Sequence, residues 1–252
     1  MEIVLLTALG VGGATVIGAI IGFLFKNISH RFSDIVLSFA AGIMLCAAVI
    51  GLILPSLEYG GELGIIKTLA GIALGAICMK LIDKLVPHLH RVKDGEVELE
   101  EHKRNSSIDK VILFVLAIAI HNFPEGIAAG VGFGAGNNAE AFVIAAGIAL
   151  QNIPEGMVII GPMLASGIQP KKTFIYAILT GVVEVIGTMV GYFAASISVA
   201  VLPFALSFAG GTMLYVISDE MIPETHSHGS ESGATFSLII GFGLMLLMDF
   251  LL

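Results

Sequence analysis

A six-residue motif occurs twice in the chain, each time inside a stretch of apolar residues. The first copy is HNFPEG, residues 121–126, and the second is QNIPEG, residues 151–156. A third acid, Glu184, stands in the middle of another apolar stretch, LTGVVEVIG. Carboxylate, amide and imidazole groups are ligands that suit zinc and its first-row neighbours. The candidate metal-binding residues are His121, Asn122, Glu125, Gln151, Asn152, Glu155 and Glu184.

The spacing within each copy predicts that its polar side chains share one side of a helix. His121 and Glu125 are four residues apart, and Asn122 and Glu125 are three apart. Glu125 can therefore join one set of ligands through His121 and another through Asn122. This geometry allows two neighbouring metal ions that share two carboxylates. The second copy repeats the arrangement with Gln151, Asn152 and Glu155.

Each of the three glutamates falls close to the middle of its apolar stretch. A carboxylate at the centre of a bilayer costs roughly 2.5–3.5 kcal/mol on insertion scales. A bound divalent cation offsets this cost and the mutual repulsion of the acids, because it is the largest local charge such a site holds. Pro124 and Pro154 lack an N–H, so the carbonyl four residues before each proline loses its helical hydrogen bond. Such an unpaired carbonyl is tolerated inside a membrane where the helix lines a cavity. Gly126 and Gly156 permit the close approach of another helix or a hydrated ion.

Long apolar stretches supply the elements that must position these residues. Hydrophobic residues make up 56% of the 252 residues and charged residues 13%, which excludes an ordinary soluble domain. A helix needs about 20 apolar residues to cross a bilayer, whereas membrane strands would be shorter and alternating. The sequence therefore predicts an all-α polytopic membrane protein with eight transmembrane helices, in which Cys46 and Cys78 are unpaired. The predicted spans are 3–25, 35–55, 64–86, 109–132, 140–165, 173–195, 198–218 and 234–252.

The lysines and arginines predict how the bundle is oriented. Of the 12 in the chain, all but Lys67 fall in or beside loops on one side of the predicted bundle. Because positive loops stay in the cytoplasm, both termini are expected to be extracytoplasmic. Residues 87–110 are expected to form a flexible cytoplasmic loop of mixed charge. The other connections are short, so we expect consecutive helices to be neighbours and residues 1–252 to form a single integral membrane domain.

These motifs resemble those of the ZIP (Zrt/Irt-like) family of divalent-metal transporters. The matching parts are HNFPEG and QNIPEG in the fourth and fifth spans, TGVVE in the sixth and SDEMIPE at the end of the seventh. The eight spans, the extracytoplasmic ends and the long third loop match as well. Gln151, where many members have histidine, resembles the bacterial GufA-type branch of the family.

The resemblance implies a set of ligands, a substrate and a mechanism. Asn152 stands where relatives have aspartate, so the second of the two implied metal sites has one negative charge fewer than theirs. Family members move Zn²⁺, and some move Cd²⁺, Fe²⁺ or Mn²⁺, towards the cytoplasm as substrate and not as cofactor. An elevator motion of helices 1, 4, 5 and 6 against helices 2, 3, 7 and 8, often in a dimer, is implied. One metal is implied at His121, Glu125, Gln151 and Glu155, and a second at Asn122, Glu125, Asn152, Glu155 and Glu184.

The sequence thus predicts an importer of divalent metal ions in the cell membrane, of the bacterial inner-membrane type, with zinc as the leading substrate. The alternative is an intramembrane metal-dependent hydrolase, which requires three firm ligands, an open position and a separate base. His121 is the one histidine in a predicted span, and no HExxH motif occurs, so we expect no enzyme. A metal sensor without flux is a third interpretation. The expected partners are metal ions, the bilayer and a second copy in a homodimer, and no basic aromatic patch indicates nucleic acid.

Further polar residues carry weaker signals. Asp219, Glu220 and Glu224 stand at a helix end, either as solvated caps or along an exit path for the ion. Six of the seven histidines fall in loops predicted to be cytoplasmic, where they are solvated or collect metal weakly. These six are His30, His88, His90, His102, His226 and His228.

Overall fold

Helices make up the described architecture. The computed structural model describes residues 1–25, 29–85, 119, 121–134, 136, 138–165, 167–197, 200–229 and 231–251. Within these ranges there is no strand, and seven helices are long and apolar enough to cross a membrane. The all-helical membrane fold is therefore confirmed. The predicted 87–110 loop and residues 109–118 and 120 of the predicted 109–132 span lie outside the described residues, so the count of eight spans stays a prediction, as does the orientation of the termini.

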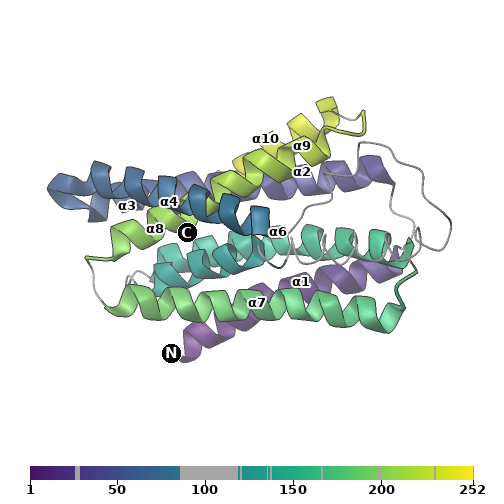
Figure 1. Ribbon diagram of the computed structural model, residues 1–252, viewed down its shortest axis with the longest axis horizontal. Helices are drawn as coiled ribbons and strands as arrows, with labels where there is room; N and C mark the ends of the chain where they lie inside the picture. Colours follow the sequence, from purple (N-terminus) through teal and green to yellow (C-terminus); the bar gives the residue numbers. More distant parts are fainter. Residues whose placement is uncertain are drawn as a thin grey trace.

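The helices follow the apolar stretches of the sequence (Figure 1). Residues 121–134 are helical as well, and they carry the first copy of the motif. The second copy lies in α6. The bounds are α1 Glu2–Leu24, α2 His30–Cys46, η1 Ala47–Ile53, α3 Leu54–Tyr59, η2 Gly61–Leu63, α4 Gly64–Leu85, α6 Asn138–Ala165, α7 Pro170–Ile197, α8 Leu202–Val216, η4 Ile217–Met221, α9 Ile222–Thr225 and α10 Glu231–Leu251.

The second span is longer than its apolar core predicts. It runs from residue 30 to residue 59 rather than from 35 to 55. At its start, the Ser29 hydroxyl accepts a hydrogen bond from the Phe32 N–H at 3.3 Å. This cap satisfies a backbone donor that would otherwise be unpaired, so the helix begins among polar residues that a hydropathy pattern passes over.

Two spans contain a widened π-helical turn, and in each a proline follows directly. The Leu54 N–H bonds to the Val49 carbonyl and the Ile222 N–H bonds to the Ile217 carbonyl, five residues back in both cases. Pro55 and Pro223 come next and cannot donate a hydrogen bond. These segments, η1 and η4, are the wide turns that often accompany functional sites.

The helices pair in two groups, and the prediction that consecutive helices are neighbours is wrong for α1. This helix packs on α6 and α7 rather than on α2, while α2 packs on α10 and α4 on α8 (Figure 1). We call α1, residues 121–134, α6 and α7 the motif group. The framework group consists of α2, η1, α3, α4, α8, η4, α9 and α10, together with the turns that join them. Small residues decide the pairing in the motif group. A Cβ at Gly156 would collide with the Thr15 carbonyl of α1, and one at Gly126 with the Glu184 carbonyl of α7.

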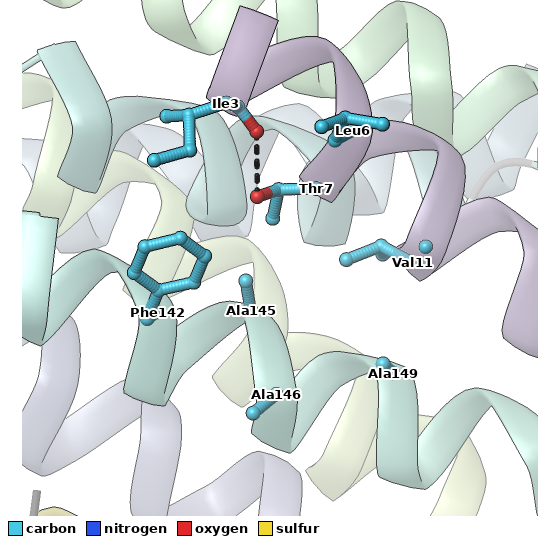
Figure 2. Close-up of a pocket in the computed structure, with 9 residues that line it drawn as sticks. Ile3, Leu6, Thr7, Val11, Phe142, Ala145, Ala146 and Ala149 are labelled. Atoms are coloured by element: carbon cyan, nitrogen blue, oxygen red, sulfur yellow. Dashed lines mark hydrogen bonds between the residues drawn. The ribbon is translucent and has the colours of Figure 1, made fainter.

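An apolar cleft of about 380 Å³ opens between α1 and α6 near their N-terminal ends (Figure 2). Ile3 and Leu6 line it from α1, and Phe142 lines it from α6. The Thr7 hydroxyl at its wall donates to the Ile3 carbonyl of its own helix at 2.8 Å. None of the seven candidate metal ligands lines this cleft, so it is not the predicted metal site.

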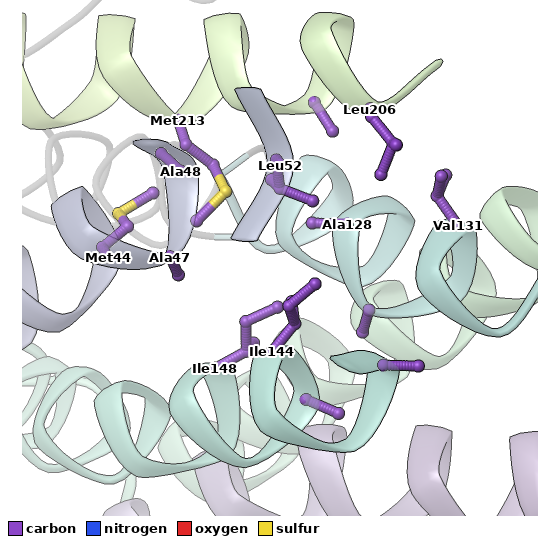
Figure 3. Close-up of a cluster of buried hydrophobic side chains, with 14 of the residues drawn as sticks. Met44, Ala47, Ala48, Leu52, Ala128, Val131, Ile144, Ile148, Leu206 and Met213 are labelled. Atoms are coloured by element: carbon purple, nitrogen blue, oxygen red, sulfur yellow. The ribbon is translucent and has the colours of Figure 1, made fainter. Parts of the chain in front are cut away.

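The two groups meet through a cluster of buried apolar side chains (Figure 3). Ala47 and Leu52 of η1 face Ala128 of the 121–134 helix and Ile144 of α6, and all four are at most 3% exposed. Met213 of α8 closes the cluster from the framework side. The boundary between the two groups is therefore formed by close-packed apolar side chains.

Candidate metal centre

The structure buries six of the seven predicted ligands within the motif group. Asn122 and Glu125 come from the 121–134 helix, and Glu184 comes from α7. Gln151 and Asn152 are fully buried in α6, and Glu155, one turn on, is 9% exposed. The seventh, the His121 side chain, is 12% exposed. Apart from His121, the two copies of the motif therefore place their polar side chains in the interior of the protein.

α1 helps to hold the carboxylate of Glu184 in place, a role that the sequence pattern does not predict. The Thr15 hydroxyl donates to Glu184 Oε2 at 3.0 Å, and the Asn152 amide donates to Glu184 Oε1. The Asn152 amide nitrogen also lies 3.2 Å from the Val11 carbonyl oxygen. Thr15 is a hydroxyl in a run of glycine and apolar residues, and that isolated polar group is the signal that could have found it.

These bonds fix which way the Asn152 side chain points. Its nitrogen faces a carboxylate and a backbone carbonyl, and both are acceptors. Turning the amide over would place its oxygen against those two oxygens, which is repulsive. The Asn152 oxygen is therefore directed away from Glu184, where it is buried and has no hydrogen-bond partner.

Other oxygens of the motif share this condition. The Asn122 side-chain nitrogen lies 3.5 Å from the Thr180 carbonyl oxygen, which is a long contact, and the Asn122 side-chain oxygen has no hydrogen-bond partner. Buried polar atoms are almost always hydrogen-bonded, so each exception calls for an explanation such as an ion. Within the two copies of the motif, the buried side-chain atoms without a hydrogen-bond partner are Asn122 Oδ1, Glu125 Oε2, Asn152 Oδ1 and both the Oε1 and the Nε2 of Gln151.

The three carboxylates also act on one another. Glu125 experiences the charges of Glu155 and Glu184, and Glu184 experiences that of Glu155. Ionised together in a buried site, they would repel one another unless a cation lay among them. Carboxylate and amide oxygens are ligands for divalent cations, and an imidazole such as that of His121 would add a ligand that zinc prefers.

His121 is not directed to this centre. Its Nε2 lies 2.8 Å from Glu220 Oε1 of η4, so the first residue of the motif is bonded to the framework group. Among the described residues, no three histidine, cysteine, aspartate or glutamate side chains are arranged around one point as metal ligands. The structure thus brings the carboxylates and amides into one buried region and holds the histidine at its edge. Asp219, by contrast, is exposed.

Comparison with known proteins identifies the family. A model described as ZIP Zinc transporter matches residues 86–249. The chain belongs to the ZIP family. The zinc transporter GufA of Myxococcus xanthus is 37% identical over 97% of this chain and 97% of its own. The zinc transporter ZIPB of Bordetella bronchiseptica is 35% identical over 94% of this chain and 77% of its own, and human zinc transporter ZIP11 is 29% identical over 94% and 93%.

Membership of the ZIP family agrees with the sequence and the fold. The family and its named members are transporters rather than enzymes, and the described residues include seven apolar helices of spanning length. This ZIP chain is a multi-pass membrane protein. Cys46 and Cys78 are free thiols, as expected of cysteines inside membrane spans.

Proposed function

We propose that this chain transports divalent metal cations, zinc foremost, across the bacterial inner membrane into the cytoplasm. The four buried oxygens without hydrogen-bond partners, supplied by Asn122, Glu125, Gln151 and Asn152, are the observation that carries the proposal. The free lone pairs of these oxygens suit a cation. The names of the relatives, which are zinc transporters, support zinc as the substrate.

We infer a site for two ions that share carboxylates. Glu125 lies one helical turn from both His121 and Asn122, so it can join two sets of ligands. Asn152 and Glu184 are hydrogen-bonded to each other and belong to one set. Amide oxygens bind zinc more weakly than imidazole or thiolate does, which favours exchange of the ion over permanent retention.

His121 would change partner during loading. Its ring must leave Glu220 before it can bind an ion beside Glu125. Because Glu220 lies in the framework group and His121 in the motif group, this exchange would couple metal binding to the contact between the groups. The apolar boundary around Ala128 and Leu52 supports an elevator-type movement of the motif group.

Uptake of Zn²⁺ into liposomes that contain the purified protein tests transport directly. A transporter will accumulate Zn²⁺ with time, whereas a metal sensor will bind it without flux and a hydrolase will act on a substrate without moving metal. Competition by Cd²⁺, Mn²⁺ and Fe²⁺ in the same assay ranks the substrates. Flux no greater than in protein-free liposomes would overturn the proposal.

The direction of transport depends on orientation, which the two ends of α6 can report. Glu140, in the first turn of this helix, and Gln169, just beyond its C-terminal end, are both exposed. In a chain with Cys46→Ser and Cys78→Ser, cysteines introduced by Glu140→Cys and Gln169→Cys should be labelled from outside and inside the cell, respectively. Labelling of both from one side would contradict the orientation that the positive charges predict.

A further inference from the structure

A second polar cluster lies where α2 begins, against the turn between α9 and α10. Asp34, in the second turn of α2, is 2% exposed. His228, in the turn after α9, places its Nδ1 at 3.1 Å from Asp34 Oδ1. The ring of His30 stacks on that of His228, with 5.0 Å between the centroids and 25° between the planes. Two imidazoles and a buried carboxylate therefore meet in the framework group, away from the helices that carry the repeated motif.

The Asp34 carboxylate is only half satisfied. Its Oδ1 contacts His228, but its Oδ2 is buried and has no hydrogen-bond partner. Ser38, one helical turn further into the protein, is fully buried, and its hydroxyl oxygen is unpartnered too. Among the described residues, the ion-pair partner of Asp34 is His228. A buried carboxylate with so little compensation is costly unless a cation completes its surroundings.

The nearby His226 shows what a purely structural histidine looks like in this turn. Its Nδ1 lies 2.8 Å from the Ile222 carbonyl, and its Nε2 lies 3.1 Å from the Thr235 hydroxyl. Both ring nitrogens are thus occupied by protein groups that fix the turn between α9 and α10. His226 serves as the matched comparison for His228. The Nδ1 of His228 faces the Asp34 carboxylate and the Ser227 hydroxyl, and its Nε2 lies 3.4 Å from the same Ser227 hydroxyl.

We propose that His30, Asp34 and His228 form a second binding site for a divalent metal of the zinc type, separate from the transport site. Two imidazoles, one carboxylate and a water molecule give the four-coordinate, exchangeable arrangement of an open zinc site. The three described side chains are not yet arranged around one point, so binding requires the exposed His30 ring to turn from its stacked position. The bound ion would join the start of α2 to the turn between α9 and α10, on the side that the charge pattern predicts to be cytoplasmic.

Metal content of the purified full-length protein tests the site. Zn²⁺ would be counted per chain by mass spectrometry after equilibration with Zn²⁺ alone and removal of free ion. Asp34→Asn keeps the size of the side chain but removes its charge, and His228→Ala removes a ligand whose side chain is 34% exposed. Each should lower the count by about one Zn²⁺ per chain and reduce the rise in Tm that Zn²⁺ causes. His226→Ala should leave the count unchanged.

The same variants made together with Glu125→Ala separate this site from the transport site. The decrease caused by Asp34→Asn or His228→Ala should be equal with and without Glu125→Ala, so failure of the transport proposal would not affect it. A full Zn²⁺ count in His228→Ala overturns the second site, even if Asp34→Asn fails to fold. A loss in His226→Ala equal to that in His228→Ala overturns it as well, because the metal would then be held adventitiously by any histidine of the turn.

Discussion

The two copies of the motif are nearly identical in sequence and differ in what surrounds them. In the first copy, the leading residue His121 reaches across to Glu220 of the framework group. In the second copy, the corresponding Gln151 is fully buried, and its side-chain nitrogen and oxygen have no hydrogen-bond partner. The second residue of the motif shows the reverse, because it is the one in the second copy that has the firmer hydrogen bonds. Asn152 is held by Glu184 and Val11, while Asn122 has one long contact.

This difference assigns the copies complementary parts. In the second copy, Asn152 is held within the motif group by hydrogen bonds to α1 and α7. The first copy contacts the other group through its histidine, so it can report the state of the site to the framework. Preorganised ligands lower the cost of binding, and one movable ligand permits release.

The largest effect is expected from removal of a carboxylate that serves both sets of ligands. Glu125→Ala and Glu155→Ala should each abolish transport. The loss should exceed the roughly 10–100-fold decrease in activity that is typical when a residue that only supports a metal ligand is changed. Metal bound at the transport site should be lost, so that only the ion proposed at His30, Asp34 and His228 is still counted. Liposome uptake and metal counted by mass spectrometry measure the two effects.

Glu184→Ala is the control for that prediction. Glu184 faces only the ligand set of Asn152, so its removal should cost at most one ion and slow transport rather than end it. If Glu184→Ala empties the protein as completely as Glu125→Ala does, the model of two sites with shared carboxylates is wrong, and one site built from three glutamates replaces it.

The sequence predicts the centre better than it predicts the surroundings of the centre. Glutamates inside apolar runs stand out because charge in lipid is costly, and six of the seven chosen residues are buried together. Thr15 and Glu220 were not placed at the site, because their contacts depend on which helices pair. That pairing follows from close backbone contacts such as Gly156 with Thr15, which join residues far apart in the chain and leave no periodic signal.

The contribution of α1 to the fixed copy is tested by Thr15→Val, which removes the hydroxyl that donates to Glu184. A hydrogen bond to a charged group contributes about 1.5–3 kcal/mol, so the carboxylate should lose its orientation and transport should slow by about tenfold. Thr7→Val in the same helix is the matched control, because that hydroxyl bonds to a carbonyl of its own helix. Equal rates for the two variants would show that Thr15 does not position Glu184.

Making the two copies alike should change selectivity more than rate. In Gln151→His, both copies would begin with histidine, and imidazole is a better ligand for zinc than an amide oxygen. Transport should continue, with Zn²⁺ favoured over Mn²⁺ by about tenfold more than in the natural chain. Competition between the two metals in liposomes measures this. Unchanged competition would mean that position 151 does not touch the ion.

The smallest effect is expected where the first copy contacts the framework. Glu220→Gln keeps the shape of the side chain but makes its bond to His121 a neutral one, which is about half as strong as a charge-assisted bond. His121 should then be released more readily towards an incoming ion, so the KM for Zn²⁺ should fall by about two- to threefold. If Glu220 also receives the ion on its way out, the maximal rate should fall with it, because an amide is the weaker acceptor. Glu224→Gln makes the same chemical change on an exposed residue of α9 and should alter neither quantity. A Glu220→Gln protein whose KM and rate match those of Glu224→Gln would show that His121 binds metal independently of the framework, and the two copies would then differ only in their leading ligand.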